Sequence, residues 1–151
     1  MNDSEFEAIV ARIQNEVFAE AKNALGVKGF DRWRNPKFCG VMADADCMAR
    51  LSGSCGDTMT IYIRMKGERL DRVSYVTDGC GSSSVAGSFT AEMATGRTIA
   101  EALALTGEDV LQEIGTFPDE EKHCAFLAVQ TLRKALKGYL VQQEERQQDV
   151  A

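Results

Sequence analysis

An alternating segment in the first half of the chain constrains the fold more than any other feature. From residue 58 to 65 apolar and polar positions alternate, and a Lys66-Gly67-Glu68 turn separates this run from a second one at 70–77. A third alternating run occupies residues 46–52. Three short strands in succession predict a three-stranded antiparallel meander, and such a sheet needs helices to cover one of its faces.

The second half of the chain supplies those helices. Residues 82–95 have helical spacing and stop at Gly96, and two capping-box patterns at 98–101 and 106–109 predict two short helices. From about residue 118 a long helix is expected, followed by a flexible polar tail at 142–151. Strands followed by helices predict an α+β class: a three-stranded antiparallel meander covered by helices on one face, with an N-terminal helix and a long C-terminal helix.

The N-terminal segment repeats apolar residues at helical spacing from about residue 4 to 25, and Gly26 is expected to end that helix. We expect this amphipathic helix to pack on the domain, with a partner-docking helix as the alternative. Residues 26–35 then form a short connection. The whole chain, 1–151, is expected to be a single domain, with the N-terminal helix and connection occupying 1–30.

Net charge limits the classes of partner. Twenty-three acidic residues against seventeen basic ones give a formal charge of −6, which argues against binding nucleic acid or anionic membranes. The apolar runs are too short to cross a bilayer, and the first residues are acidic and polar, unlike a signal peptide. A cytoplasmic location is the expectation.

The chain has five cysteines and a single histidine, which lies directly beside one of them in His123-Cys124. An odd number of widely spaced cysteines argues against a disulfide framework, and the absence of a CxxC pair argues against zinc ribbons and thioredoxin-like motifs. Adjacent imidazole and thiolate donors suit a metal or an activated nucleophile. Any metal site must therefore be assembled from distant segments.

The predicted topology brings two glycine-flanked cysteines together. Cys55 lies in the loop before the second strand and Cys80 in the loop after the third, and in a meander these loops fall at the same end of the sheet. A helix crossing that end can bring His123 and Cys124 to them. Asp57 adds a hard, exchangeable carboxylate beside soft thiolates, which would weaken a cluster site compared with an all-cysteine cage.

Each of these residues also has an ordinary structural explanation. A cysteine alone is often a small buried hydrophobe, and an aspartate after glycine before a strand is a common turn residue. The combination favours a metal site. A Cys–His thiol enzyme is less favoured, because neighbours on a helix point about 100° apart and His123 cannot readily deprotonate Cys124.

These motifs resemble the iron–sulfur cluster assembly scaffolds, the NifU N-terminal domain and IscU-like proteins. The matching segments run in the family's order from about Asn35 to Tyr139: Asn35-Pro36 with Gly40, Cys55-Gly56-Asp57, Gly79-Cys80-Gly81-Ser82, Glu92 with Gly96, Glu101-Ala102, Leu105-Thr106 and His123-Cys124-Ala125. The resemblance implies a scaffold and not an enzyme.

The resemblance also implies a ligand set, a cofactor and partners. Metal ligands would be Cys55, Asp57, Cys80, His123 and Cys124, with either Asp57 or His123 as the fourth cluster ligand. The cofactor would be a labile 2Fe–2S cluster, with zinc in the isolated protein as an option. A cysteine desulfurase, iron and electron donors and recipient apo-proteins would be the partners, and a homodimer is left open. The alternative within this fold is a zinc-binding persulfide acceptor; such relatives lack the histidine that His123 provides here.

Three positions depart from the family pattern. The acidic segment 117–121 stands where housekeeping relatives carry an apolar and basic motif read by a heat-shock chaperone, which argues against dependence on that chaperone. Cys39 and Cys47 lie outside the ligand set. We predict a packed core thiol at Cys47 and an inert thiol at Cys39, so that Cys39→Ser leaves cluster assembly intact; an extra ligand or a sulfur relay is the alternative at Cys39.

Overall fold

The computed structural model describes residues 1–54 and 56–150 and contains the predicted meander. Strands β1 (Cys47–Ser52), β2 (Thr58–Lys66) and β3 (Arg69–Thr77) form an antiparallel sheet in the order β1-β2-β3. Ile61 of β2 pairs with Ala49 on one side and with Tyr75 on the other. All three side chains are buried, so the alternating pattern places one face of the sheet in the core as predicted.

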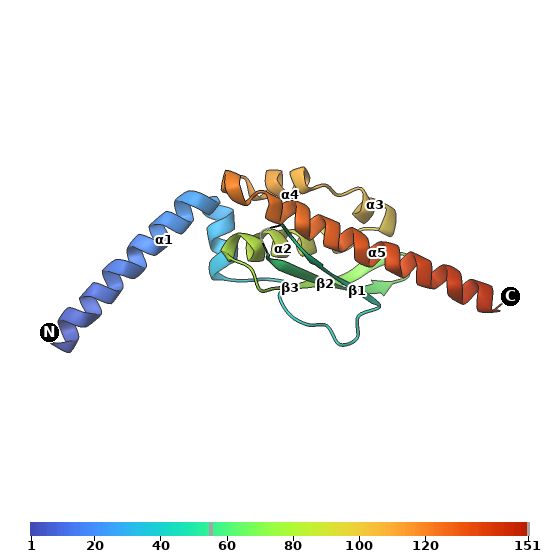
Figure 1. Cartoon of the computed structure of the whole chain (residues 1–151), viewed down its shortest axis with the longest axis horizontal. Helices are drawn as coiled ribbons and strands as arrows, with labels where there is room; N and C mark the ends of the chain where they lie inside the picture. Colours follow the sequence, from blue (N-terminus) through green and yellow to red (C-terminus); the bar gives the residue numbers. More distant parts are fainter. Residues whose placement is uncertain (55, 151) are drawn as a thin grey trace.

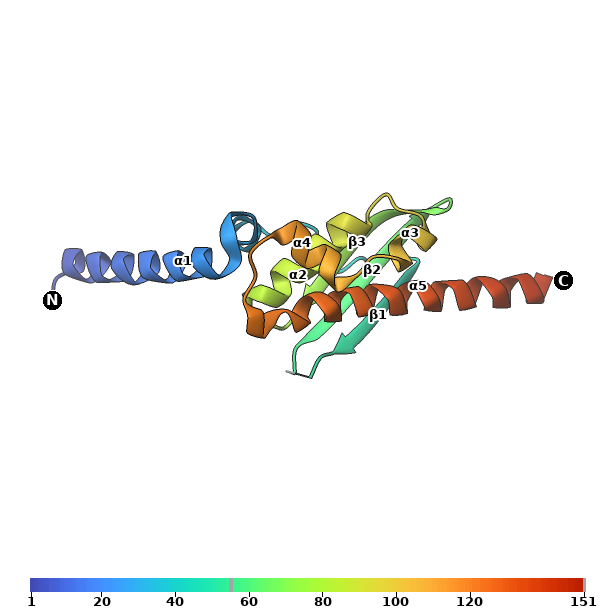
Figure 2. The ribbon, with the colours of Figure 1, turned by 90° about the horizontal axis from the view of Figure 1, so that it is seen from above.

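Helices α2 (Gly81–Ala94) and α5 (His123–Val150) cover that face of the sheet (Figures 1 and 2). Their buried residues join the sheet in one core. The largest side chains that are essentially without solvent contact are Tyr75, Met59, Ile61, Ile63, Leu70, Leu105, Leu132, Leu136, Val85, Val110 and Val129. The α+β class and its one covered face are therefore confirmed.

Both predicted capping boxes are present. The Thr98 hydroxyl accepts from the Glu101 amide at the start of α3 (Ile99–Leu103), and Thr106 does the same for Asp109 at the start of α4 (Gly107–Ile114). A 3-10 turn, Asp119–Glu121, then leads into α5. The long helix therefore begins at His123 and not near residue 118, which places the His-Cys pair in its first turn.

One expectation about the N-terminal part of the chain is wrong. The 26–35 connection is helical, because α1 (Asp3–Arg34) is interrupted only at Gly26, whose φ of 72° kinks the helix before it resumes. A Cβ at Gly26 would lie 2.8 Å from Thr116 Cβ, so close packing against the segment after α4 sets the kink. At the other end, α5 continues to Val150 where the sequence predicts a flexible tail.

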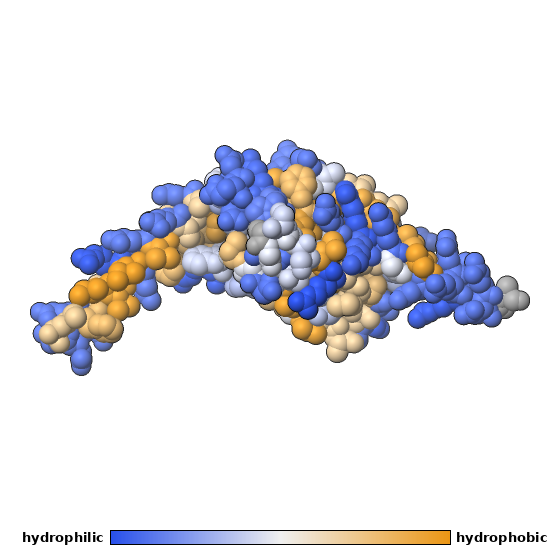
Figure 3. Space-filling model, viewed as in Figure 1, coloured by the Kyte–Doolittle hydropathy of each residue, from blue (hydrophilic) through white to orange (hydrophobic). Residues whose placement is uncertain are grey.

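The first part of α1, residues 3–25, projects away from the rest of the molecule (Figures 1 and 2). We call this segment the arm. Its apolar side chains form a stripe that Figure 3 shows in orange: Phe6, Ile9, Val10, Ile13 and Val17, between 37% and 59% exposed. The expectation that this helix packs on the domain is thus wrong, because α2 and α5 already fill the covered face of the sheet.

The second part of α1 is fixed to α2 through Arg32, which is 8% exposed. Its guanidinium donates to Ser88 Oγ at 3.0 Å, pairs with the Glu92 carboxylate and lies 4.1 Å from the centre of the Phe89 ring. This anchor places Trp33 against Gly81 at the start of α2, where a Cβ on the glycine would lie 2.9 Å from the indole nitrogen.

Among the helices that the structure describes, none has both the length and the apolar character needed to cross a bilayer.

Candidate metal centre

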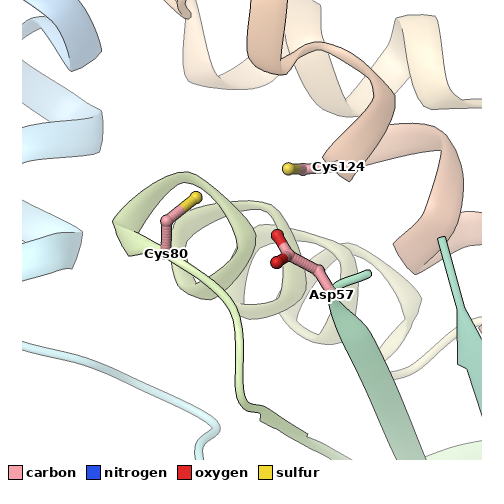
Figure 4. A group of neighbouring side chains, drawn as sticks. All are labelled: Asp57, Cys80 and Cys124. Carbon is pink, nitrogen blue, oxygen red and sulfur yellow. The ribbon is translucent and has the colours of Figure 1, made fainter. Parts of the chain in front are cut away.

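Three potential metal donors from three different elements meet at one end of the sheet. Asp57 immediately precedes β2, Cys80 is the N-cap of α2, and Cys124 lies in the first turn of α5. Their donor atoms all lie within 4.8 Å of one another (Figure 4). This first group contains three of the five predicted ligands; Cys55 lies outside the described residues.

Gly79 makes room for this arrangement. A Cβ at this position would lie 2.7 Å from Asp57 Cγ and 2.6 Å from Ser83 Oγ, which is closer than real Cβ contacts. The glycine before Cys80 is therefore required because the Asp57 carboxylate occupies the space that a side chain would fill.

Ser83, in the first turn of α2, contacts both Asp57 and Cys124. Its hydroxyl donates a 2.7 Å hydrogen bond to Asp57 Oδ2 and lies 3.3 Å from Cys124 Sγ. The serine side chain is fully buried, so its hydrogen bonds are protected from competing water. Ser83 thereby holds the carboxylate close to the buried thiol.

Cys124 has no solvent exposure. Burial raises the pKa of its thiol to about 12; the Ser83 hydrogen bond opposes this shift, while the neighbouring Cys80, Glu121 and Asp57 add to it. The thiolate is the form that binds metal, so a cation that binds here must displace a proton. Without a cation the site keeps Cys124 protonated at neutral pH.

A second group of donors shares Cys124. Glu121, His123 and Cys124 also have donor atoms within 4.8 Å of one another. His123 Nε2 lies 3.7 Å from Cys124 Sγ and 4.0 Å from Glu121 Oε2. The His-Cys pair therefore belongs to the same centre as Asp57 and Cys80, as the topology predicts.

Two residues of this centre, Glu121 and Ser83, were not predicted from the sequence. Glu121 stands three residues before Cys124, a spacing that places two side chains on the same side of a helical turn. The acidic segment 117–121, which contains Glu121, differs from a family motif, but that difference does not indicate a ligand. Ser83 had no distinguishing signal within a run of three serines.

The donor set mixes soft, borderline and hard ligands. Two thiols suit iron–sulfur or zinc chemistry, an imidazole suits zinc or iron, and the carboxylates exchange more readily. Cys80 is exposed while Cys124 is buried, so one side of the centre faces solvent and the other is closed by the core. These residues fit a metal ion or an iron–sulfur cluster.

The remaining described cysteines lie apart from the donor groups. Cys39 is exposed, and its backbone pairs with that of Tyr75 in an isolated β-bridge. Cys39 and Cys80 line the same cavity of about 320 Å³. Cys47 packs against the core from β1, and burial, with a smaller effect from Asp46, raises the pKa of its thiol to about 11. Partial burial agrees with the predicted packing role of Cys47.

The fold and these donors define an α+β domain with a group of potential metal ligands at one end of its sheet. The model of the NifU-like N-terminal domain matches residues 27–146, and the chain belongs to that family. It is 39% identical over 113 residues to iron–sulfur cluster assembly scaffold protein IscU 1 of Archaeoglobus fulgidus, covering 74% of each chain. The scaffold protein IscU of Aquifex aeolicus is 36% identical over 119 residues, covering 77% of this chain and 76% of the relative.

Solved structures agree with this assignment. A putative iron–sulfur cluster assembly scaffold protein for the SUF system from Fervidobacterium islandicum superposes with a TM-score of 0.62 at 25% identity, over 74% of this chain and 95% of that one. A NifU-like N-terminal structure from Brucella abortus gives 0.60 at 17% identity, over 77% and 94%, and supports the fold. The family match begins at residue 27, so the arm lies outside it.

Proposed function

We propose that this protein is an iron–sulfur cluster assembly scaffold and not an enzyme. The observation that carries the proposal is the convergence of Asp57, Cys80 and Cys124 within 4.8 Å, in a chain of the NifU-like N-terminal family. The protein receives sulfur from a cysteine desulfurase and iron from a donor, assembles a labile 2Fe–2S cluster and passes it to recipient apo-proteins.

The chemistry requires both a thiolate acceptor and a source of electrons. An acceptor thiolate attacks the outer sulfur of a desulfurase persulfide, forming a new S–S bond while the desulfurase thiolate leaves. Each transferred sulfur then needs two electrons to become sulfide, which explains the electron donor among the proposed partners. The exposed thiol of Cys80 is suited to this encounter.

Four protein ligands complete two tetrahedral irons that share two sulfides. We propose Cys55, Cys80 and Cys124 as three of them, with Asp57 or His123 as the fourth. Zinc can occupy the same donors in the isolated protein.

The free thiols of the described cysteines support a reducing, cytoplasmic location. The acidic residues of the 3-10 turn argue against the heat-shock chaperone that reads a basic motif.

Anaerobic reconstitution with ferrous iron, cysteine and a cysteine desulfurase tests the proposal. The expected product is a 2Fe–2S absorption spectrum that is lost in Cys55→Ala, Cys80→Ala and Cys124→Ala and kept in the control Cys39→Ser. Subsequent transfer to an apo-ferredoxin is followed by the recipient's spectrum.

A different outcome would replace the scaffold by the persulfide acceptor. Tight stoichiometric zinc, faster turnover of the desulfurase and no cluster under any reconstitution condition would assign that second function. Loss of the visible band in Cys39→Ser would instead show that Cys39 is a ligand or relay.

A further inference from the structure

Glu121 lies beside three of the predicted ligands although it is not among them. Its Oε2 atom lies 3.8 Å from Cys124 Sγ, 3.9 Å from Cys80 Sγ and 4.0 Å from His123 Nε2. One carboxylate oxygen is thus within 4.0 Å of a donor atom on each of three other residues. No other described carboxylate has this relation to all three of them.

We propose that Glu121 is a metal ligand, which binds a divalent cation together with His123 and Cys124 before sulfide is present. The proposal rests on the scaffold function, because it adds a loading position for iron to the same centre. A carboxylate and an imidazole are suitable ligands for ferrous iron when sulfide is still missing, and thiolates dominate once a cluster forms.

The backbone around Glu121 supports this role. Glu121 ends the 3-10 turn, where its amide donates to the Pro118 carbonyl at 3.0 Å, and α5 starts two residues later. Its side chain is 34% exposed, so the carboxylate is partly desolvated beside the buried Cys124 thiol. Both donor groups contain Cys124, so a cation bound by Glu121 lies next to Asp57 and Cys80.

A purely structural role for Glu121 predicts different behaviour. The carboxylate can pair with a protonated His123 ring, and that pairing would orient the imidazole without any metal. In that case the amide of a glutamine, which still forms hydrogen bonds, would preserve the arrangement. A ligand role requires the negative charge and is lost with glutamine.

Anaerobic titration with cobalt(II) as the probe distinguishes the two roles. In Glu121→Gln we expect about tenfold weaker cobalt(II) binding, with the thiolate-to-cobalt absorption still present because the cysteines are intact. Ligand-field bands should change in the same variant, because their intensity reports coordination number. Glu120→Gln is the matched control, since the neighbouring Glu120 is exposed and belongs to neither donor group.

Equal affinity and unchanged bands in Glu121→Gln and Glu120→Gln would overturn the proposal. Weakened binding in Asp57→Asn but not in Glu121→Gln would do so as well. The measurement uses metal alone, so its outcome is independent of the scaffold function. A wild-type protein that binds cobalt(II) through Glu121 but never forms a cluster would refute the scaffold function and leave the metal-ligand role of Glu121 intact.

A second inference comes from the apolar stripe of the arm. Five acidic residues against two basic ones surround the stripe within residues 1–25. Glu16 and Glu20 border it directly, because each lies three residues from a stripe position, Ile13 and Val17 respectively. The occupant of this face must therefore offer apolar surface with a basic border.

A groove of this chemistry exists on the chain itself. The groove, of about 890 Å³, lies between the edge strand β1 and α5 and is lined by Met48, Ala49, Arg50, Gln130, Arg133, Lys134, Lys137, Gly138 and Val141. Met48 and Val141 are 50% and 53% exposed, and a Cβ at Gly138 would meet no atom within 4 Å. Four of the lining residues are basic and none is acidic.

We propose that the arm of one copy docks in this groove of a second copy of the chain. The lengths correspond: residues 6 to 17 of the stripe and 130 to 141 of the groove each span about 16 Å of helix. Pairing of two arms is disfavoured because their glutamates would face each other. Reciprocal docking gives a closed dimer, and one-way docking gives a ring or a chain.

Light scattering after gel filtration, over a range of concentrations, tests the proposal with the full chain. The wild-type chain should associate. Two double variants should each need about tenfold more protein to associate: the arm variant Glu16→Lys/Glu20→Lys and the groove variant Lys134→Glu/Lys137→Glu. Combining all four changes in one chain should restore association. Asn15→Lys is the control, since its position two residues from Ile13 is on the opposite side of the helix.

Two outcomes would overturn self-docking. One is a monomer at every concentration up to millimolar. The other is association that the arm variants abolish while the groove variants leave it intact, because the arm would then bind elsewhere. The four substituted side chains are exposed, so we expect the variants to fold. Circular dichroism of each variant checks this.

Discussion

The Ser83 hydroxyl donates a 2.7 Å hydrogen bond to Asp57 Oδ2, joining the first turn of α2 to the residue before β2. The bond fixes a carboxylate beside two thiols, where the loss of hydration would otherwise favour its movement towards solvent. Asp57 is thus held in place by the fold before any metal arrives. Its contribution can be tested directly.

Asp57→Ala should make an assembled cluster more persistent. A carboxylate is a hard ligand that dissociates from iron more readily than thiolate, so its removal takes away an exchangeable position. The half-life of the visible absorption band, measured anaerobically with a chelator present, should lengthen several-fold. Asp119→Ala, which changes an exposed carboxylate in the 3-10 turn, should leave the half-life unchanged. A faster decay in Asp57→Ala would contradict the exchangeable role.

Gly79→Ala should disturb the centre without unfolding the chain. The added methyl group would lie 2.7 Å from Asp57 Cγ, so the carboxylate must move, and overpacking of this kind costs about 1–3 kcal/mol. We expect weaker zinc binding, measured by competition with a chromophoric chelator. Gly138→Ala is the matched control, because its Cβ enters open space. Unchanged zinc affinity in Gly79→Ala would show that Asp57 is not required for binding.

Arg32→Ala should lower the free energy of unfolding by about 2 kcal/mol, because a buried guanidinium loses a hydrogen bond to Ser88, an ion pair with Glu92 and its contact with Phe89. Urea denaturation followed by circular dichroism measures the change. The exposed Arg34 lies 4.2 Å from the centre of the Phe18 ring, and Arg34→Ala should cost about 0.5 kcal/mol. Equal losses of unfolding free energy in Arg32→Ala and Arg34→Ala would show that Arg32 does not anchor α1.

The stability of the protein should fall as the pH rises from about 9 to 11, in part through Cys47. Burial raises the pKa of this thiol from 9.0 to about 11 in the folded state, so the folded state keeps a proton that the unfolded state releases. The contribution is complete below pH 9 and is lost as the pH approaches 11. Urea midpoints at pH 8 and pH 10 should differ less in Cys47→Ala than in wild type; identical pH dependence would contradict the raised pKa.

Much of the fold was predictable because local rules agree with the tertiary structure. Alternation at 58–65 and 70–77 specified which side of each strand is buried, and the capping boxes at Thr98 and Thr106 fixed the start of two helices. The position of Cys80 beside Asp57 followed from the order of antiparallel strands. These features depend on neighbours in sequence or on adjacent strands.

The course of α1 was less predictable for a physical reason. Amphipathic spacing in residues 4–25 indicates an apolar face but not what covers it, and here the arm remains exposed. Gly26 signals a helix stop, yet the chain resumes a helix because Gly29 and Arg32 find buried positions after the kink. Packing against α2 and α4 outweighed the local stop signal.

The sequence by itself determined the class of fold, the types of potential metal donor and the pairing of loops that brings Asp57 and Cys80 together. Only the tertiary structure placed Glu121 among three donors and Ser83 between Asp57 and Cys124. The contacts of Glu121 with Cys80 and of Ser83 with Asp57 and Cys124 join residues far apart in the chain, and their distances depend on how α5 and its preceding turn lie across α2. Spacing along one chain contains no information on that crossing, because it arises from side-chain packing in the core.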